Sequence, residues 1–289
     1  MPVLWIVNHY AQEPSGPGGT RHHSLAKHLL DHGWQTLIIA SSCEHNTGRQ
    51  RLAPGDHQRF QRFNGVDFLW LRVLGEPNAR RWHRFASMLV FACTLLKRST
   101  THGLPPPDVV IGSTVHPFAA FAACLLARRY RVPFVFEVRD LWPRTLVSME
   151  LIRANGFFDR VLGWLERWLA HRADRIIVLM QGGVDYFQAF GITPERLLWL
   201  PNGAELPVTP PSPLRLQPSP FQLLYFGAHG PANALDNVID AMSLLQRRGV
   251  GSDQLILRLF GDGSYKASLQ QRAEALGLTG VYFEPPVPK

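Results

Sequence analysis

The stretch VLWIVNHYAQEPSGPGGTRHHSLAKHLL, residues 3–30, decides the fold because it predicts a strand, a glycine-rich loop and a helix in that order. It begins with an unbroken apolar run, which is typical of a strand covered on both faces. After the loop, Leu25, Leu29 and Leu30 recur at helical spacing, and Gly33 is a suitable helix terminator. A first strand that ends this way is a candidate phosphate or sugar site.

The glycine-rich loop, residues 14–21, is compatible with two roles. Gly18 and Gly19 let backbone N–H groups approach a ligand, and the following helix N-terminus favours an anion. Arg21 is expected in the first helical turn, where its guanidinium could meet a carboxylate or a phosphate. The loop is not a P-loop, since no Gly-Lys-Ser/Thr closes it, and Arg21 occupies the third glycine position of a dinucleotide fingerprint. An ordinary turn explains the loop equally well.

The composition predicts a folded protein of a reducing compartment. The 289 residues are enough for two domains, and an apolar content of 46% predicts a hydrophobic core. Cys43, Cys93 and Cys124 are far apart and odd in number, which favours buried thiols over disulfides or metal ligands. A strand begins within the first residues, so no signal peptide is expected, and no apolar run is long enough to span a membrane.

The net charge of +8 is concentrated in one part of the chain. Residues 49–98 carry ten basic and three acidic residues, and such an excess indicates a phosphate-rich partner. Within it, residues 80–98 predict a helix with Trp82 and Phe85 on an apolar face and basic residues at both ends. The helix is either a core helix or one that lies in an anionic membrane surface. Nucleic acid is not an expected partner, since no recognition motif accompanies the basic residues.

Strands and helices alternate through the first part of the chain. Further strands are expected at residues 35–40, 66–73, 108–112, 133–137, 175–179 and 197–200, with helices between most of them. Such alternation predicts an α/β fold with a parallel sheet and right-handed crossovers. One of these helices, residues 157–171, carries Trp164 and Trp168 at i, i+4 and is expected to pack against the sheet.

Charged residues appear abruptly at the end of the apolar strand 133–137. Glu137, Arg139 and Asp140 follow there, and His9 and His116 follow two other strands. Because ligands bind beyond the carboxyl ends of parallel strands, these side chains are expected to converge on one crevice. A structural role is favoured for either histidine alone, whereas the run Glu-Val-Arg-Asp-Leu-Trp-Pro is favoured as functional. The candidate catalytic residues are therefore Arg139, Asp140, Glu137 and His116.

A second, smaller domain follows a proline-rich segment. Residues 206–220 contain six prolines and predict an extended, semi-rigid hinge between a domain at 1–205 and another at 221–289. The second domain shows three strands, at 221–226, 255–260 and 281–283, with glycine loops after the first two. Since open nucleotide-binding sheets normally have five or six strands, we expect this domain to be incomplete and the chain to be truncated.

These segments together resemble the GT-B fold, two Rossmann-like domains with parallel sheets. The resemblance is to retaining family-4 glycosyltransferases, especially the bacterial colanic acid and O-antigen N-acetyl-amino-sugar transferases. FEVRDLWP followed by LPNGAE is its most specific part. The matching segments are NHYAQEPSGPGGTRHHSLAKHL (8–29), FEVRDLWP (136–143), LPNGAE (200–205), YFGAHGPANALDNVIDA (225–241) and LFGDGS (259–264).

The resemblance implies roles for individual residues. Arg139 and Asp140 stand where many relatives have a His-Asp pair near the transferred sugar. Ala228 and Asn233 stand where many relatives have an Arg and a Lys that neutralise the diphosphate, so Arg21 or backbone amides would do so here. Val287 would edge the base, usually uracil. The implied donor- and phosphate-binding set is Gly18, Gly19, Arg21, Gly227, His229, Asn233, Gly261, Asp262, Gly263 and Val287.

The resemblance also implies a function. The expected reaction moves a sugar, with retention, from a UDP-sugar to a polyprenyl-diphosphate-linked acceptor, with no metal or cofactor, in bacterial surface polysaccharide synthesis. The protein would be cytoplasmic and peripheral on the inner face of the cell membrane, docked through residues 80–98. The relatives' acidic motif and final helix would lie beyond Lys289, so weak donor binding and little turnover are expected. A sugar-nucleotide epimerase and a non-catalytic membrane-binding fragment are the alternatives.

Overall fold

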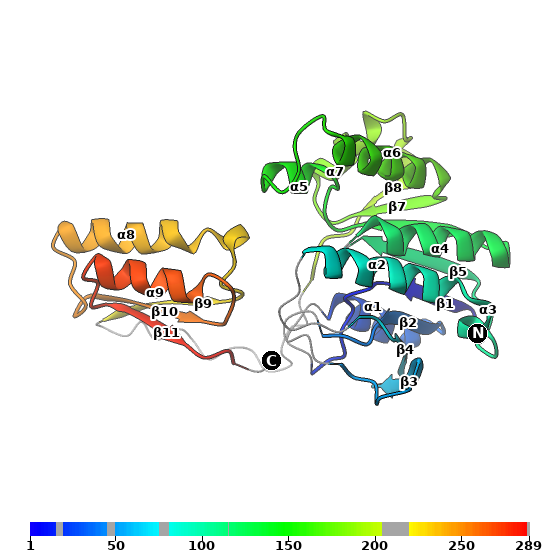
Figure 1. Cartoon of the computed structure of the whole chain (residues 1–289), viewed down its shortest axis with the longest axis horizontal. Helices are drawn as coiled ribbons and strands as arrows, with labels where there is room; N and C mark the ends of the chain where they lie inside the picture. Colours follow the sequence, from blue (N-terminus) through cyan, green and yellow to red (C-terminus); the bar gives the residue numbers. More distant parts are fainter. Residues whose placement is uncertain (16–19, 45–49, 75–80, 115, 204–219, 288–289) are drawn as a thin grey trace. The chain divides into compact units, whose positions relative to one another are not determined.

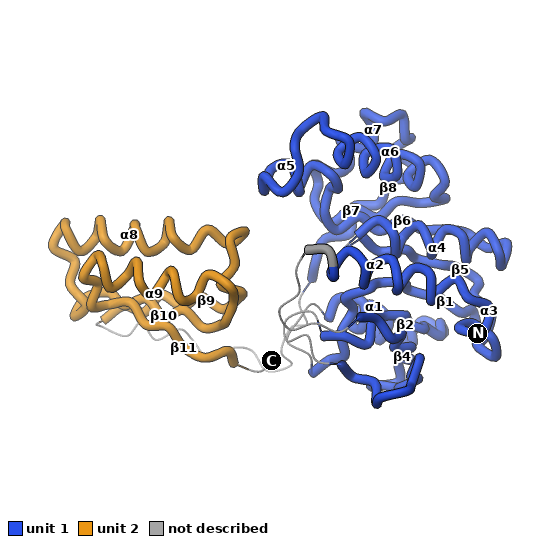
Figure 2. The backbone as a smooth tube through the Cα atoms, in the orientation of Figure 1, with its two compact units in different colours: residues 1–204 blue, residues 205–289 orange. Residues whose placement is uncertain are grey.

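The computed structural model describes residues 1–15, 20–44, 50–74, 81–114, 116–203 and 220–287. The chain forms two compact units, residues 1–204 and residues 205–289 (Figure 2). The predicted hinge, 206–220, lies almost wholly outside the described residues.

Unit 1 is built on a mixed sheet with strand order β3-β4-β2-β1-β5-β6-β7-β8 (Figure 1). All neighbours are parallel except β3 and β4, so the α/β class expected for this part is confirmed. Because β1 is central, its residues are fully enclosed, as their apolar sequence predicts. The strands are β1 (Val3–Val7), β2 (Gln35–Ser41), β3 (Gln58–Phe63), β4 (Val66–Leu71), β5 (Val109–Thr114), β6 (Phe134–Val138), β7 (Arg175–Val178) and β8 (Leu197–Trp199).

Strand β3 has no counterpart in the sequence prediction. It is an edge strand whose residues are mostly exposed, so its sequence, QRFQRF, lacks the apolar pattern of a core strand. The Asn-Gly turn that follows β3 is the sequence feature that indicates a hairpin here. Asn64 and Gly65 both have positive φ and join β3 to β4 as a two-residue hairpin, the geometry that Asn-Gly pairs favour.

Helices cover both faces of the unit 1 sheet. Residues of α2, α4 and α6 pack into one core cluster with Trp5 and Val7, and residues of α1 pack on the other face with Leu4 and Ile6. The helices are α1 (Arg21–Asp31), α2 (Arg81–Leu96), α3 (Arg98–Thr101), α4 (Pro117–Tyr130), α5 (Arg144–Ser148), α6 (Phe157–Arg172) and α7 (Gly182–Gln188).

Helix α2, which includes most of the basic segment 80–98, packs largely into this core. Its Phe91 and Leu95 are fully buried, whereas Phe85 and Leu89 are 40% and 38% exposed. The core-helix alternative therefore accounts for Phe91 and Leu95, and the membrane-surface alternative stays a prediction. None of the described helices is long and apolar enough to cross a membrane.

Unit 2 has a parallel three-stranded sheet in the order β11-β10-β9. Both helices pack on one face of the sheet, where Ile239 and Leu269 are buried. On the other face Leu224 and Phe226 are more than half exposed, and Phe226 stacks on Phe260. The elements are β9 (Phe221–Phe226), α8 (Leu235–Arg247), β10 (Leu255–Phe260), α9 (Lys266–Ala275) and β11 (Val281–Glu284).

The contact between β5 and α4 depends on a glycine. A Cβ added to Gly112 would lie 2.8 Å from the Ala123 Cβ and 3.0 Å from both the Ala120 Cα and a Phe134 ring carbon. The alanine-rich face of α4 therefore lies directly on the backbone of β5. Such a contact leaves no room for an added methyl group.

We predict that Gly112→Ala destabilises unit 1 by about 1–3 kcal/mol through overpacking. All eight tryptophans lie before residue 205, so tryptophan fluorescence during urea unfolding reports unit 1 alone. Gly182→Ala is the matched control, because nothing lies within 4 Å of its added Cβ. Equal unfolding midpoints for the two variants would contradict the packing described here.

Candidate active site

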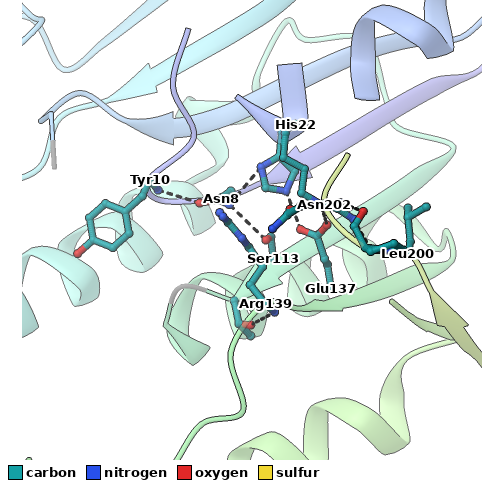
Figure 3. A network of polar contacts seen from close by, with 11 residues as sticks. Asn8, Tyr10, His22, Ser113, Glu137, Arg139, Leu200 and Asn202 are labelled. Atoms are coloured by element: carbon teal, nitrogen blue, oxygen red, sulfur yellow. Dashed lines mark hydrogen bonds and ion pairs between the residues drawn. The ribbon is translucent and has the colours of Figure 1, made fainter. Parts of the chain in front are cut away.

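A row of polar side chains crosses the carboxyl ends of three neighbouring strands of unit 1 (Figure 3). Ser113 of β5 and Glu137 of β6 are register partners, and Asn8 follows the last residue of β1. The Asn8 side-chain amide donates to the Ser113 hydroxyl at 3.2 Å. All three residues are buried, so the row needs internal partners to satisfy its polar groups.

Glu137 is the charged centre of this row. Its side chain is 1% exposed, and its two oxygens lie 2.9 Å from the Arg21 Nε and 2.6 Å from the His22 Nε2. Burial opposes its ionisation, but the adjacent His22 and hydrogen bonds from His22, Ser113 and Arg21 hold the Glu137 pKa well below its ordinary range. The carboxylate is therefore ionised and fully engaged by its neighbours.

The hydrogen bonds around Asn8 assign the donor and acceptor nitrogens of His22. The Tyr10 backbone N–H donates to the Asn8 Oδ1 at 2.8 Å, so the Asn8 NH₂ group faces the His22 Nδ1 at 3.2 Å. The Nδ1 therefore accepts a hydrogen bond, and the Nε2 donates to Glu137. Through His22 and Asn8 the start of α1 is tied to the end of β1.

Arg21 extends the network to the segment after β8. Its Nη1 donates to the Pro201 carbonyl oxygen at 2.7 Å and its Nη2 to the Leu200 carbonyl oxygen at 2.9 Å. A longer contact of 3.4 Å reaches the Asn202 Oδ1. Arg21 was predicted to meet either a carboxylate or a phosphate. In the structure it meets the Glu137 carboxylate, and its phosphate-binding role stays a prediction.

The candidate catalytic pair, Arg139 and Asp140, follows this anchored carboxylate directly. Both residues are half-buried, and the Arg139 backbone N–H donates to the Thr114 Oγ1 at 3.0 Å. Arg139 therefore lies beside the polar row in Figure 3. Their catalytic roles stay predictions.

His116 lies at the start of α4 and caps that helix. Its Nδ1 accepts from the Ala119 backbone N–H at 3.3 Å, and burial lowers the pKa of its ring to about 3. It packs edge-to-face on His9, which packs in turn on Phe91. No hydrogen-bond partner for the His116 Nε2 occurs in the described parts of the chain. The cap and the burial account for His116 structurally, and its catalytic role remains a prediction.

A second buried carboxylate supports the loop that carries Arg139 and Asp140. Glu166 of α6 accepts a 2.6 Å hydrogen bond from the Tyr186 hydroxyl, and the Trp142 backbone also hydrogen-bonds to its carboxyl group. One turn earlier, an added Cβ on Gly163 would lie 3.8 Å from Pro143. Helix α6 therefore holds the end of the loop through the hydrogen bond to Glu166, and an added Cβ on Gly163 would just reach Pro143.

In unit 2 the glycine loops after β9 and β10 lie against each other. Gly261 and Gly263 have positive φ values of 146° and 159°. A Cβ on Gly261 would overlap the Gly227 carbonyl oxygen, and one on Gly263 would overlap the His229 backbone. The His229 N–H donates to the Asp262 carbonyl oxygen at 2.9 Å. The glycines are therefore required for close backbone packing of the two loops.

His229 has an unusual environment within these loops. Its ring is fully buried, yet neither ring nitrogen has a hydrogen-bond partner within the described ranges. Burial, and next the charge of Lys266, lower the His229 pKa. Lys266 itself donates to the Gly261 and Glu284 carbonyl oxygens. An uncharged ring with open hydrogen-bonding capacity therefore lies beyond the carboxyl end of β9.

The remaining predicted donor residues are only partly placed. Asn233 ends a short 3-10 turn before α8, and Val287 lies just beyond β11 and is half exposed. Gly18 and Gly19 lie outside the described residues.

The sequence prediction missed two residues of the polar row, Asn8 and Ser113, and a third residue that binds it, His22. A signal for two of them was present. Asn8, Ser113 and Glu137 are each the first polar residue after an apolar run, and parallel pairing of their strands would have aligned them. His22 carried no such signal. It lies between Arg21 and His23, and only the phase of the helix decides which of these side chains point toward Glu137.

The fold and the site together define the class of protein. Two solved structures with the GT-B fold match 99% of this chain: HepE (Alr3699) of Anabaena, in complex with UDP, and WaaG, a glycosyltransferase involved in lipopolysaccharide biosynthesis. The TM-scores are 0.60 and 0.59 at 18% and 16% identity, and the match covers 70% of each of those chains. At such identities the similarity shows the fold alone, and the GT-B expectation is confirmed.

Residues 16–203 match the glycosyl transferase 4-like domain, so the chain belongs to that family. A relative in Escherichia coli K12 carries the name colanic acid biosynthesis glycosyl transferase WcaI. It is 24% identical over 242 residues, which are 78% of this chain and 58% of the relative. The chain thus spans little more than half the length of that relative.

We predict that ionisation of Glu166 destabilises unit 1 as the pH rises. Burial raises the pKa of Glu166 to about 7, while hydrogen bonds from Tyr186 and the nearby Arg144 and Arg167 oppose the rise. The folded state therefore holds this proton at pH values where the unfolded chain, with a pKa near 4.5, has lost it. The stability that protonated Glu166 contributes is fully present below pH 4.5. It falls by about 3 kcal/mol as the pH rises from there to about 7.

Glu166→Gln should remove this pH-dependent loss, because the amide does not ionise. Urea unfolding followed by tryptophan fluorescence between pH 5 and pH 8, in steps of about one unit, measures the difference between wild type and variant. Glu150→Gln, on an exposed residue, is the control and should follow the wild-type curve. A wild-type minus Glu166→Gln difference that is constant with pH would show that Glu166 does not titrate in this range.

Proposed function

We propose that the protein transfers a sugar, with retention at the anomeric carbon, from a UDP-sugar to a lipid-linked acceptor. Membership of the glycosyl transferase 4-like family supports glycosyl transfer, and the similarity of the fold to HepE with bound UDP supports a UDP-linked donor. The sequence resemblance favours an N-acetyl-amino sugar. The relative WcaI is named for colanic acid biosynthesis, which supports a role in surface polysaccharide synthesis.

The packed glycine loops of unit 2 are the observation that supports a donor site in this unit. They bring the backbone of residues 227–230 and 261–263 together beyond β9 and β10, just before the N-termini of α8 and α9. Helix N-termini and loop amides favour the negative charge of a diphosphate. The unpartnered nitrogens of His229 add donor and acceptor capacity at the same place.

The reaction exchanges one bond at the anomeric carbon. The bond from that carbon to the diphosphate oxygen breaks, UDP departs with the electron pair, and the acceptor hydroxyl oxygen forms the new bond to the same carbon. The acceptor proton passes to the departing phosphate. Stabilising the charge that develops on the diphosphate is the main physical demand. Arg139 and Asp140 are proposed to contact the transferred sugar, while Glu137 positions the loop that carries them.

We propose that this chain alone binds its donor weakly. Strand β9 is one edge of the unit 2 sheet as described, and Leu224 and Phe226 on its uncovered face are 54% and 59% exposed. An exposed apolar sheet face is a surface that further elements normally cover. Additional elements over this face would strengthen the donor site.

The proposed lipid-linked acceptor is supported by the distribution of positive charge in unit 1. Residues 49–98 carry a strong basic excess, which suits an anionic polyprenyl-diphosphate carrier and the inner face of the cell membrane. A groove of about 890 Å³ in unit 1 lies in this segment and is lined by Arg72, Lys97 and His57 among others. We propose that it lies on the acceptor side of the enzyme.

A radiolabel assay tests the reaction. The chain is incubated with UDP-N-acetyl sugars at millimolar concentration and with polyprenyl-diphosphate-linked acceptors, and labelled lipid is extracted. We expect slow transfer that Asp140→Asn lowers by about 100-fold, with UDP affinity unchanged in titration calorimetry. Asp31→Asn, at the far end of α1, is the matched control and should retain wild-type activity.

Two outcomes of this assay would reject the proposal. Protein that binds UDP but transfers none of the sugars to any acceptor is not a transferase of this type. Conversion of the UDP-sugar to its epimer in the absence of acceptor would instead support the sugar-nucleotide epimerase.

A further inference from the structure

Helix α6 presents large apolar side chains to solvent. Phe157, Phe158 and Trp164 are 75%, 58% and 62% exposed, and Val161 between them is also exposed. Phe157, Val161 and Trp164 recur at i, i+4 and i+7, so they form one stripe along the helix. The sequence predicts that this helix packs against the sheet, and Leu165, Leu169 and Trp168 do pack in the core cluster of unit 1. Trp164, which was expected there too, instead faces solvent.

The charges of α6 are segregated around this stripe. Arg160, Arg167 and Arg172 are exposed, and the helical phase places them beside the stripe. The guanidinium groups of Arg167 and Arg172 lie over the rings of Phe190 and Trp168. Neither acidic residue of the helix lies on this side. Asp159 accepts the Asn155 backbone N–H at 2.7 Å, and Glu166 is buried against Tyr186. The outward face of α6 is therefore apolar at its centre and positive at its edges.

Exposed apolar side chains also occur in the segment between α5 and α6. Met149 and Leu151 are each about 40% exposed, and the charged residues Glu150 and Arg153 near them are exposed as well. Figure 1 shows α6 at the end of the unit 1 sheet that β7 and β8 form. The apolar side chains of the α6 face are Phe157, Phe158, Val161 and Trp164.

We propose that this α6 face docks unit 1 on an anionic phospholipid bilayer. Phenylalanine and tryptophan enter the boundary between headgroups and acyl chains, and arginines at the border pair with lipid phosphates. An acidic protein partner would satisfy the arginines but would not require an apolar stripe of this size. The charge complementarity and the aromatic stripe together select a bilayer.

The location differs from the one expected from sequence, residues 80–98. Helix α2 uses Phe91 and Leu95 for the core, and among its described side chains the exposed large apolar ones, Phe85 and Leu89, are only 40% and 38% exposed. The inference deepens the proposed function, since a lipid-linked acceptor lies in a membrane. It is nevertheless tested by binding alone, without any sugar transfer.

Vesicle co-sedimentation tests the inference. The full chain is mixed with phosphatidylcholine vesicles, with or without phosphatidylglycerol, and the bound fraction is measured. We expect binding only to the anionic vesicles, weakened by salt, and a loss of about tenfold in affinity for the double variant Phe157→Ser, Trp164→Ser. Phe85→Ser, Leu89→Ser on α2 is the control and should bind as the wild type does. Circular dichroism shows whether each variant remains folded.

A second measurement does not depend on weakened binding. Brominated lipids quench tryptophans that enter the acyl region, and Trp164→Phe should keep vesicle binding but lose most of the quenching. The inference is overturned if the α6 double variant binds as the wild type does, or if Trp164→Phe leaves the quenching unchanged. It is also overturned if the wild type ignores anionic vesicles and instead forms a dimer that the double variant abolishes. Failure here with transfer to a water-soluble acceptor analogue intact would leave the proposed function standing.

Discussion

The buried ion pair of Glu137 with Arg21 is the interaction on which the site of unit 1 depends. A carboxylate with almost no exposed surface is stable only when its charge is paired and its oxygens are hydrogen-bonded. Arg21 and His22 meet this requirement from the first turn of α1. The same guanidinium binds the chain after β8, so one charge joins the start of α1, the end of β6 and residues 200–202.

This anchor explains how the loop that carries Arg139 and Asp140 can be held without being buried. The loop leaves β6 after Val138, one residue beyond Glu137, and its far end hydrogen-bonds to Glu166 of α6 through the Trp142 backbone. Arg139 and Asp140 lie between the two fixed ends and remain partly exposed. Groups that act on a substrate need this combination, because a rigid frame positions them while their own polar atoms stay available. In the proposed reaction, Glu137 and Glu166 position the loop and the residues between them meet the substrate.

The sequence was sufficient for most of the fold because apolar runs mark strands that are buried on both faces. It failed at β3, an exposed edge strand, where burial does not shape the sequence. The position of Glu137 at a strand end was predictable, and Arg21 was expected to meet a carboxylate or a phosphate. The pairing of Arg21 with Glu137 in particular, and the contact from His22, were not predictable, since they depend on the phase of α1 and on strand register. The outward stripe of α6 was missed for a related reason. A helix with aromatic residues on two sides does not reveal which side meets the sheet.

A double-mutant cycle on Arg21 and Glu137 measures the central interaction most directly. Urea unfolding at neutral pH, followed by tryptophan fluorescence, gives unit 1 stabilities for wild type, Arg21→Met, Glu137→Gln and the double variant. We predict a coupling energy of at least about 2 kcal/mol, because Arg21→Met removes the cation paired with the buried Glu137 carboxylate and Glu137→Gln removes the charge that Arg21 neutralises. Additive effects, with coupling below about 0.5 kcal/mol, would show that the two residues do not stabilise each other. The role given to this ion pair would then be wrong.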